Sequence, residues 1–209
     1  MNSSSDKQTM LGRMAIASGV IGALVGILAL AYPAAVSDRT WSYPFPFGVA
    51  VVVSLVLAVA HALTGAGYQG VRLANAHGRS RAADVALRVA IVGFTLLAVA
   101  ELASGIIGRQ SDESSAAGVV GGLFGVASLL VGVASIVAGV VIARSRASEP
   151  GTWWSLLAAG VILLLVVTPA QIADSFEIAT IALTVWSLAF IPLGRAVIKA
   201  GEVKSRDVV

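Results

Sequence analysis

Two ionisable side chains inside long apolar runs are the residues of this chain whose types could do chemistry. His61 lies within the apolar run at 47–67, and Tyr68 follows about two turns later on the same helical face. Glu101 lies within the run at 87–107. Ionisable groups in hydrocarbon are costly, so each is expected to face other helices. Each then either serves as a proton or solute site or makes one structural hydrogen bond.

His61 and Glu101 are expected to lie at different depths in the membrane. The run ends at 47 and 107 would share one membrane surface. At 1.5 Å per residue, His61 lies about 21 Å and Glu101 about 9 Å below those ends. The difference of about 12 Å excludes a direct hydrogen bond between the two side chains. A proton path joining them would need water or further residues.

Polar residues of a later run are the expected neighbours of Glu101. By the same count, Thr168 reaches nearly the depth of Glu101, and Gln171 lies just above it. These residues predict a polar vestibule on the outer side of the membrane. The alternative is one ionic tie from Glu101 to Arg39 or Arg109 near the headgroups, where long basic side chains reach water at little cost.

Signatures of catalysis and cofactor binding are absent from the sequence. The chain has no cysteine, which excludes thiolate catalysis, disulfides and thiolate-bound metals. No zinc-protease or serine-hydrolase pattern occurs either. The glycines at 65, 67 and 70 match the spelling of a dinucleotide-binding loop, but that loop must follow a strand, and here an apolar helix precedes it. The sequence therefore predicts a protein that is not an enzyme and binds no cofactor or metal.

The elements that must position these residues are membrane-spanning helices. Hydrophobic residues make up 57% of the chain and charged residues 12%, against about 25% charged in a soluble domain. A hydrocarbon core of about 30 Å needs roughly 20 apolar helical residues. The sequence predicts an all-α bundle of six transmembrane helices in one domain, 1–209, without an extramembrane domain. The expected spans are 14–31, 47–67, 87–107, 118–143, 153–169 and 178–197.

The distribution of basic residues predicts the orientation. Of the 14 Lys and Arg residues, only Arg39 and Arg109 would lie outside if the chain starts in the cytoplasm. We therefore expect both termini in the cytoplasm, and the excess of Arg over Lys suggests a bacterial plasma membrane. The sequence Ala29-Leu30-Ala31 leaves one alternative open, because it resembles a signal-peptidase site after residues 1–31.

Small residues at steps of three and four predict where helices pack. In lipid, helices associate largely through close backbone approach at such residues. Two runs carry the pattern, and we expect both to be buried against neighbouring helices along these faces. The glycines of the two seams are Gly19, Gly22 and Gly26 in the first run, and Gly118, Gly122, Gly125, Gly132 and Gly139 in the fourth.

The expected partners are lipid and other membrane proteins. The net charge of +3 reflects the inside loops rather than a nucleic-acid surface, because no stacking aromatics interrupt a basic stripe. A basic cluster beside the membrane offers a place for anionic lipid headgroups, although the topology alone also explains it. Its arginines are Arg72, Arg79, Arg81 and Arg88.

Two functional hypotheses follow from these features. The first is a non-enzymatic interaction, lipid-binding or accessory protein that packs through its glycine seams, with a second copy or another membrane protein as partner. The second is a small-solute or proton-coupled transporter or channel that uses the vestibule at Glu101.

Overall fold

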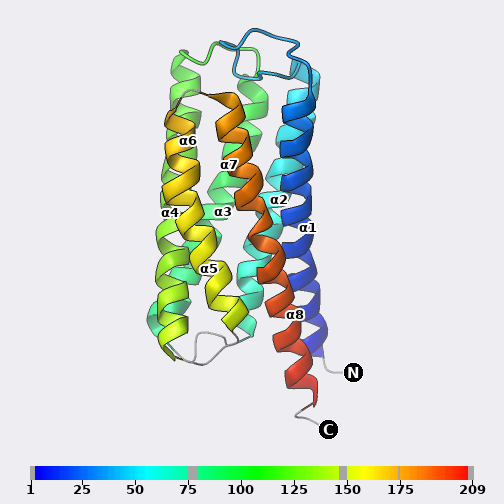
Figure 1. Cartoon of the computed structure of the whole chain (residues 1–209), viewed down its shortest axis with the longest axis vertical. Helices are drawn as coiled ribbons and strands as arrows, with labels where there is room; N and C mark the ends of the chain where they lie inside the picture. Colours follow the sequence, from blue (N-terminus) through cyan, green and yellow to red (C-terminus); the bar gives the residue numbers. More distant parts are fainter. Residues whose placement is uncertain (1–2, 75–79, 146–149, 174, 207–209) are drawn as a thin grey trace.

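The computed structural model describes residues 3–74, 80–145, 150–173 and 175–206, with the side chains of residues 5–202 in those ranges (Figure 1). The first four long helices are α1 (Ser3–Ala31), α2 (Phe47–Leu73), α3 (Arg81–Ile107) and α4 (Ser115–Ser145). The fifth span joins α5 (Pro150–Ile162), a π-helical turn η1 (Leu163–Val167) and α6 (Thr168–Ile172). The sixth joins α7 (Phe176–Leu188) and α8 (Phe190–Arg206).

Six of these helical stretches are long and apolar enough to cross a membrane. Among the described residues, the β-structure is one isolated bridge between Thr40 and Ser111. The all-α prediction is confirmed, and the chain is a multi-pass membrane protein. The helices run past several predicted span ends, since α2 continues to Leu73 and α3 begins at Arg81. A helix keeps its backbone hydrogen bonds in water as well as in lipid, so polar residues end the apolar run without ending the helix.

The spans form a closed ring in chain order. Each of the first four packs against the next, α5 packs against α8, and α1 closes the ring by contacting both α7 and α8. The chain termini lie at one end of the bundle, here called the terminal end (Figure 1). The opposite end is the cap end, where α1 connects to α2 and α3 to α4.

The two connections at the cap end pair with each other. The Trp41 backbone N–H donates to the Gln110 carbonyl at 3.0 Å, and the Asp112 N–H donates to the Arg39 carbonyl at 3.0 Å. The Trp41 indole N–H also donates to Ser104 Oγ on α3 at 2.7 Å. These bonds satisfy backbone groups that a loop would otherwise leave to solvent, and they cover the end of the bundle.

Prolines interrupt the fifth and sixth spans. Each proline lacks an N–H, and its ring clashes with the carbonyl four residues earlier. Before Pro169 the backbone widens into η1, where the hydroxyl of Thr168 donates to the Leu163 carbonyl at 2.9 Å. Pro192 lies four residues after Leu188, where α7 ends. The interruptions therefore follow from the positions of the two prolines.

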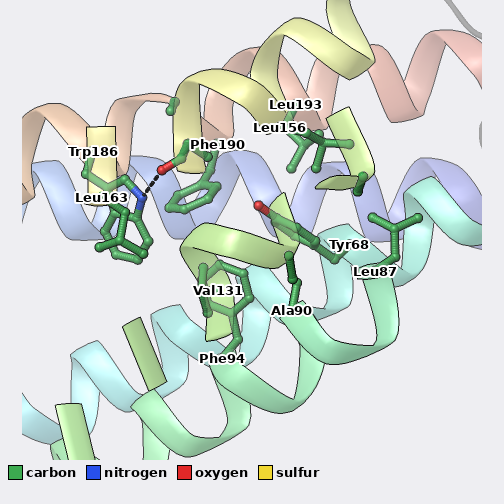
Figure 2. Packing of buried hydrophobic residues seen from close by; sticks show 14 of the residues in the cluster. Tyr68, Leu87, Ala90, Phe94, Val131, Leu156, Leu163, Trp186, Phe190 and Leu193 are labelled. Atoms are coloured by element: carbon green, nitrogen blue, oxygen red, sulfur yellow. Dashed lines mark hydrogen bonds between the residues drawn. The ribbon is translucent and has the colours of Figure 1, made fainter. Parts of the chain in front are cut away.

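Aromatic side chains pack together inside the ring (Figure 2). The rings of Phe94 and Trp186 stack with centroids 6.2 Å apart, and Phe190 meets both edge-on. The Trp186 indole N–H donates to the Ala159 carbonyl at 3.0 Å, and the Tyr68 hydroxyl bonds to Ser135 Oγ at 2.7 Å. Their polar atoms are thus paired inside the protein, as a membrane interior requires.

The glycine seam of α1 packs against another helix, as predicted. A Cβ added at Gly19 would lie 2.8 Å from the Ser187 carbonyl oxygen, and one at Gly22 or Gly26 would overlap the side chain of Ser187 or Thr184. These partners belong to α7. Further toward the terminal end, Gly12 and Gly194 of α8 lie against each other's carbonyls. The first span therefore packs backbone to backbone on the last one.

The prediction for α4 is right for one half of the helix and wrong for the other. A Cβ at Gly132 or Gly139 would lie under 3 Å from Leu164 or Leu157 of the fifth span. At Gly118, Gly122 and Gly125, an added Cβ would meet nothing within 4 Å. The helix α4 packs against α5 and η1, and this contact thins out at α6. The fifth span turns away from α4 at η1, whereas the glycine pattern of α4 continues beyond that level.

The two glycine environments predict opposite mutational outcomes. Gly19→Leu should lower stability by about 1–3 kcal/mol, because the side chain would force α1 away from α7. Gly125→Leu should leave stability equal or slightly raised, since leucine favours the helix over glycine by up to about 1 kcal/mol. Thermal melting of the purified variants in detergent measures both. Destabilisation by Gly125→Leu as large as that by Gly19→Leu would contradict the structure.

Candidate functional site

The structure brings His61 and Glu101 together. The distance from His61 Nε2 to Glu101 Oε1 is 3.5 Å, and the two side chains are only 15% and 12% exposed. The expectation that depth keeps them about 12 Å apart is therefore wrong. Sequence reasoning identified both residues and missed that they form a pair.

The register of α2 against α3 explains the error. Gly105 lies against Ser54, and Gly65 lies against Phe94, so His61 is level with Ala98. Glu101 is three residues further toward the cap, an axial offset of about 4.5 Å. The end of α3 therefore lies deeper than the start of α2, and the predicted depths were counted from two different levels.

Side-chain direction closes the remaining offset. In a helix each Cα–Cβ bond tilts toward the N-terminus. Because α2 and α3 run in opposite directions, His61 leans toward the cap end and Glu101 leans toward the terminal end. The two side chains thus approach each other. The pair is about 21 Å below Phe47 and 18 Å above Leu73 along α2, near the middle of the bundle.

The surroundings of the pair are aromatic and uncharged. The imidazole centroid of His61 lies 6.4 Å from that of Phe94 and 6.2 Å from that of Trp186. The other described ion pairs lie in the cap or near the terminal end. In such a dry environment, a charged carboxylate depends on its one cationic or hydrogen-bonding partner. The pair can share or hold a proton between an acid and a base.

The remaining residues predicted for this site lie elsewhere. Thr168 donates to the backbone of η1, and Gln171 is exposed on α6. Tyr68 is buried in the aromatic core, bonded to Ser135. None of the described contacts of these residues reaches Glu101, so they form no vestibule around it.

The alternative ionic tie is also not formed. Arg39 pairs with Glu113 at 3.4 Å in the cap, where both side chains are 77% exposed. Arg109 lies over the Phe47 ring, with its guanidinium carbon 4.3 Å from the centroid. Both cations therefore stay at the cap end, and Arg109 follows Glu101 by about two helical turns.

Hollows flank the pair along the outside of the α2–α3 seam. On the terminal side, a hollow of about 350 Å³ has His61, Gln69 and Thr95 among its lining residues. On the cap side, another of about 530 Å³ is lined by residues that include Ser54 and Leu102. Small residues such as Gly65 leave the room for the first hollow.

A larger hollow, here called the α3–α4 groove, lies between those two helices and encloses about 870 Å³. Its walls are alanine, valine and leucine side chains, with one arginine at the terminal end. No signal in the sequence indicated this groove, because its lining residues are ordinary apolar span residues. They are Arg81, Ala82, Val85, Ala86, Val89, Val126, Leu129, Leu130, Val133, Ala134 and Val137.

The described arginines of the basic cluster differ in their ion pairs. Asp84 accepts hydrogen bonds from Arg72 Nε and from Arg88 Nε, each at 2.8 Å. Arg72 also donates to Gln69 at 2.6 Å. Arg81 is exposed in the first turn of α3, and none of the described ion pairs includes it. Arg79 lies outside the described residues.

Comparison with known proteins adds no family. No protein family matches the chain, and neither a curated protein nor a solved structure does. Inference about function therefore depends on the geometry of the pair and of the groove.

The pair predicts energetic coupling between its two members. In a double-mutant cycle, His61→Gln and Glu101→Gln should show an interaction free energy of about 1–3 kcal/mol, since they are in direct contact. Glu101→Gln with Thr168→Val is the control and should be additive within about 0.5 kcal/mol. Melting of the purified variants in detergent measures both cycles. Coupling of Glu101 to Thr168 but not to His61 would support the predicted vestibule and contradict the observed register of α2 against α3.

Proposed function

We propose that this chain is a non-enzymatic membrane protein that binds phospholipid in the α3–α4 groove. The observation that carries the proposal is the groove itself, about 870 Å³ in volume and lined by apolar side chains from two helices. Its lining residues Val85, Val126 and Val133 are each at least half exposed. In a bilayer, a hollow of this kind is in contact with acyl chains, which match its surface.

The packing of the bundle supports a binding role over a transport role. The inside of the ring is filled with aromatic and aliphatic side chains, and the first and last spans meet backbone to backbone. Such close packing makes a rigid scaffold, which presents a groove of fixed shape. The large hollow lies outside this packed interior, between neighbouring helices.

The orientation that we propose places the terminal end in the cytoplasm. Support comes from the charge distribution, since of the chain's 14 basic residues only Arg39 and Arg109 belong to the cap end. The Arg-rich composition further suggests a bacterial plasma membrane.

In intact cells, an impermeant thiol reagent should modify Ser37→Cys in the cap and spare Asp6→Cys on α1. Modification of Asp6→Cys would contradict the proposed orientation.

Filling the groove tests the lipid-binding proposal. Val133→Trp places a bulky ring in the groove and should reduce the phospholipid that co-purifies with the protein by at least severalfold. Val59→Trp is the matched control, because Val59 is 56% exposed on α2 against 51% for Val133 and does not line the groove. Native mass spectrometry of the detergent-purified protein counts bound lipid. Equal retention by both variants would refute the proposal.

Proton-coupled transport is the second candidate, and one observation favours it. The buried His61–Glu101 pair has hollows on both sides along the α2–α3 seam. Such a pair is a functional candidate by default in a membrane interior. Proton uptake by proteoliposomes that is lost in a folded Glu101→Gln variant would establish this candidate. Absence of uptake by the unmodified protein would leave the pair as a structural tie between α2 and α3.

A further inference from the structure

The α3–α4 groove covers about half the thickness of a hydrocarbon core of about 30 Å. Its lining residues on α4 run from Val126 to Val137, an axial length of about 16 Å. One leaflet of a hydrocarbon core is about 15 Å thick. The groove is therefore as long as one leaflet, which suits an acyl chain and is too short for a spanning helix.

Side chains close the space between α3 and α4 on the cap side of the groove. Phe124 is partly buried and packs against both the main core and a second cluster. That cluster is formed by Ile107, Ala117 and Val120 of the same two helices. A ligand in the groove thus has a closed end near mid-height and an open end at Arg81.

The charge at the open end is positive. Arg81 lies in the first turn of α3, next to the N-cap residue Ser80, whose Oγ accepts the Ala83 N–H. On α4, Arg144 is exposed and lies seven residues beyond the lining residue Val137, which places it on the same helical face. A guanidinium binds phosphate oxygens through two parallel hydrogen bonds.

The neighbouring arginines differ from Arg81 in their bonding. Arg72 and Arg88 both donate to the carboxylate of Asp84, which neutralises part of their charge and fixes their position. Neither lines the groove. The sequence alone treats the arginines of this cluster as equivalent, whereas the structure separates Arg81 from Arg72 and Arg88.

From this arrangement we infer that the α3–α4 groove selects an anionic phospholipid from the leaflet at the terminal end, with Arg81 as the residue that recognises the headgroup. The inference rests on the proposed lipid-binding function and adds the lipid class and the residue that determines it. An acyl chain lies along Val133 and Val137, and the phosphate and its anionic headgroup meet Arg81. The Asp84-bound arginines make no direct contribution to the selection.

Two lipid probes test this inference. Palmitoyl-oleoyl phosphatidylglycerol and the corresponding phosphatidylcholine carry the same chains and differ in net charge. Titrated into the delipidated full-length protein in detergent and followed by native mass spectrometry, phosphatidylglycerol should bind about fivefold more tightly, the factor expected for one basic residue near the surface. Raised salt should reduce this preference, because the contact is electrostatic at an exposed site.

Matched arginine variants locate the preference. Arg81→Gln should lose most of the preference, since Arg144 is still present at the open end. Arg81→Lys should keep most of the preference, and Arg88→Gln should keep all of it, because Arg72 still holds Asp84. A preference that survives undiminished in Arg81→Gln, or that is lost in Arg88→Gln, overturns the inference. Gel filtration of each variant confirms that it is folded before the comparison is made.

The groove variant separates failure of this inference from failure of the proposed function. If Val133→Trp loses both lipids while Arg81→Gln keeps its preference, the groove binds lipid but Arg81 does not select it. If Val133→Trp keeps both lipids, the lipid-binding function itself fails, and this inference fails with it. A change of oligomeric state in Val133→Trp with unchanged lipid binding would assign the groove to a second copy of the chain.

Discussion

The helices of this structure must touch closely, because the hydrophobic effect contributes little to helix association in lipid. The rest of the structure depends on this constraint. Lipid chains are as apolar as the side chains they surround, so burying one apolar face against another gains little. What remains is dispersion, which requires atoms to touch. The first span meets the last through Gly12, Gly19 and Gly194, where a single methyl group would overlap backbone or side-chain atoms. The ring closes at that seam, and the aromatic core fills the space it encloses.

The same constraint explains where polar groups occur. Backbone groups are satisfied within helices, and the proline interruption in the fifth span recovers one bond through the Thr168 hydroxyl. Two polar side chains of the aromatic core find partners on other helices, since Tyr68 bonds to Ser135 and Trp186 donates to the Ala159 carbonyl. His61 and Glu101 follow this rule as a pair. Their chemistry, whether structural or proton-carrying, follows from being each other's partner in a dry seam.

The sequence predicted the spans well because the cost of burying a charge in lipid limits each apolar run. It also identified Gly132 and Gly139 as packing residues, but it did not distinguish them from Gly118, Gly122 and Gly125. A small-residue pattern describes one helix, whereas burial depends on whether a partner follows it, and here the fifth span turns away at η1. The His61–Glu101 contact was missed for a related reason. Axial register between helices comes from tertiary packing, and run ends are a poor measure of it.

The pairing of Asp84 with Arg88 had a signal, since the two are four residues apart on one helix. That Arg81 belongs to none of the described ion pairs had no such signal.

The seam between α1 and α8 has a consequence for biosynthesis. Gly12 and Gly194 are separated by nearly the whole chain, so the surface that α1 presents to α8 has no partner until the last span leaves the ribosome. At about 5–20 residues per second, that interval is on the order of ten seconds or more. During it, α1 resides in the membrane with a smooth, unpaired face on which neighbouring nascent helices or insertion factors can bind. Completion of the ring is therefore a late event in the synthesis of each molecule. A chain truncated before α8 retains an exposed contact surface on α1, which quality-control machinery can recognise.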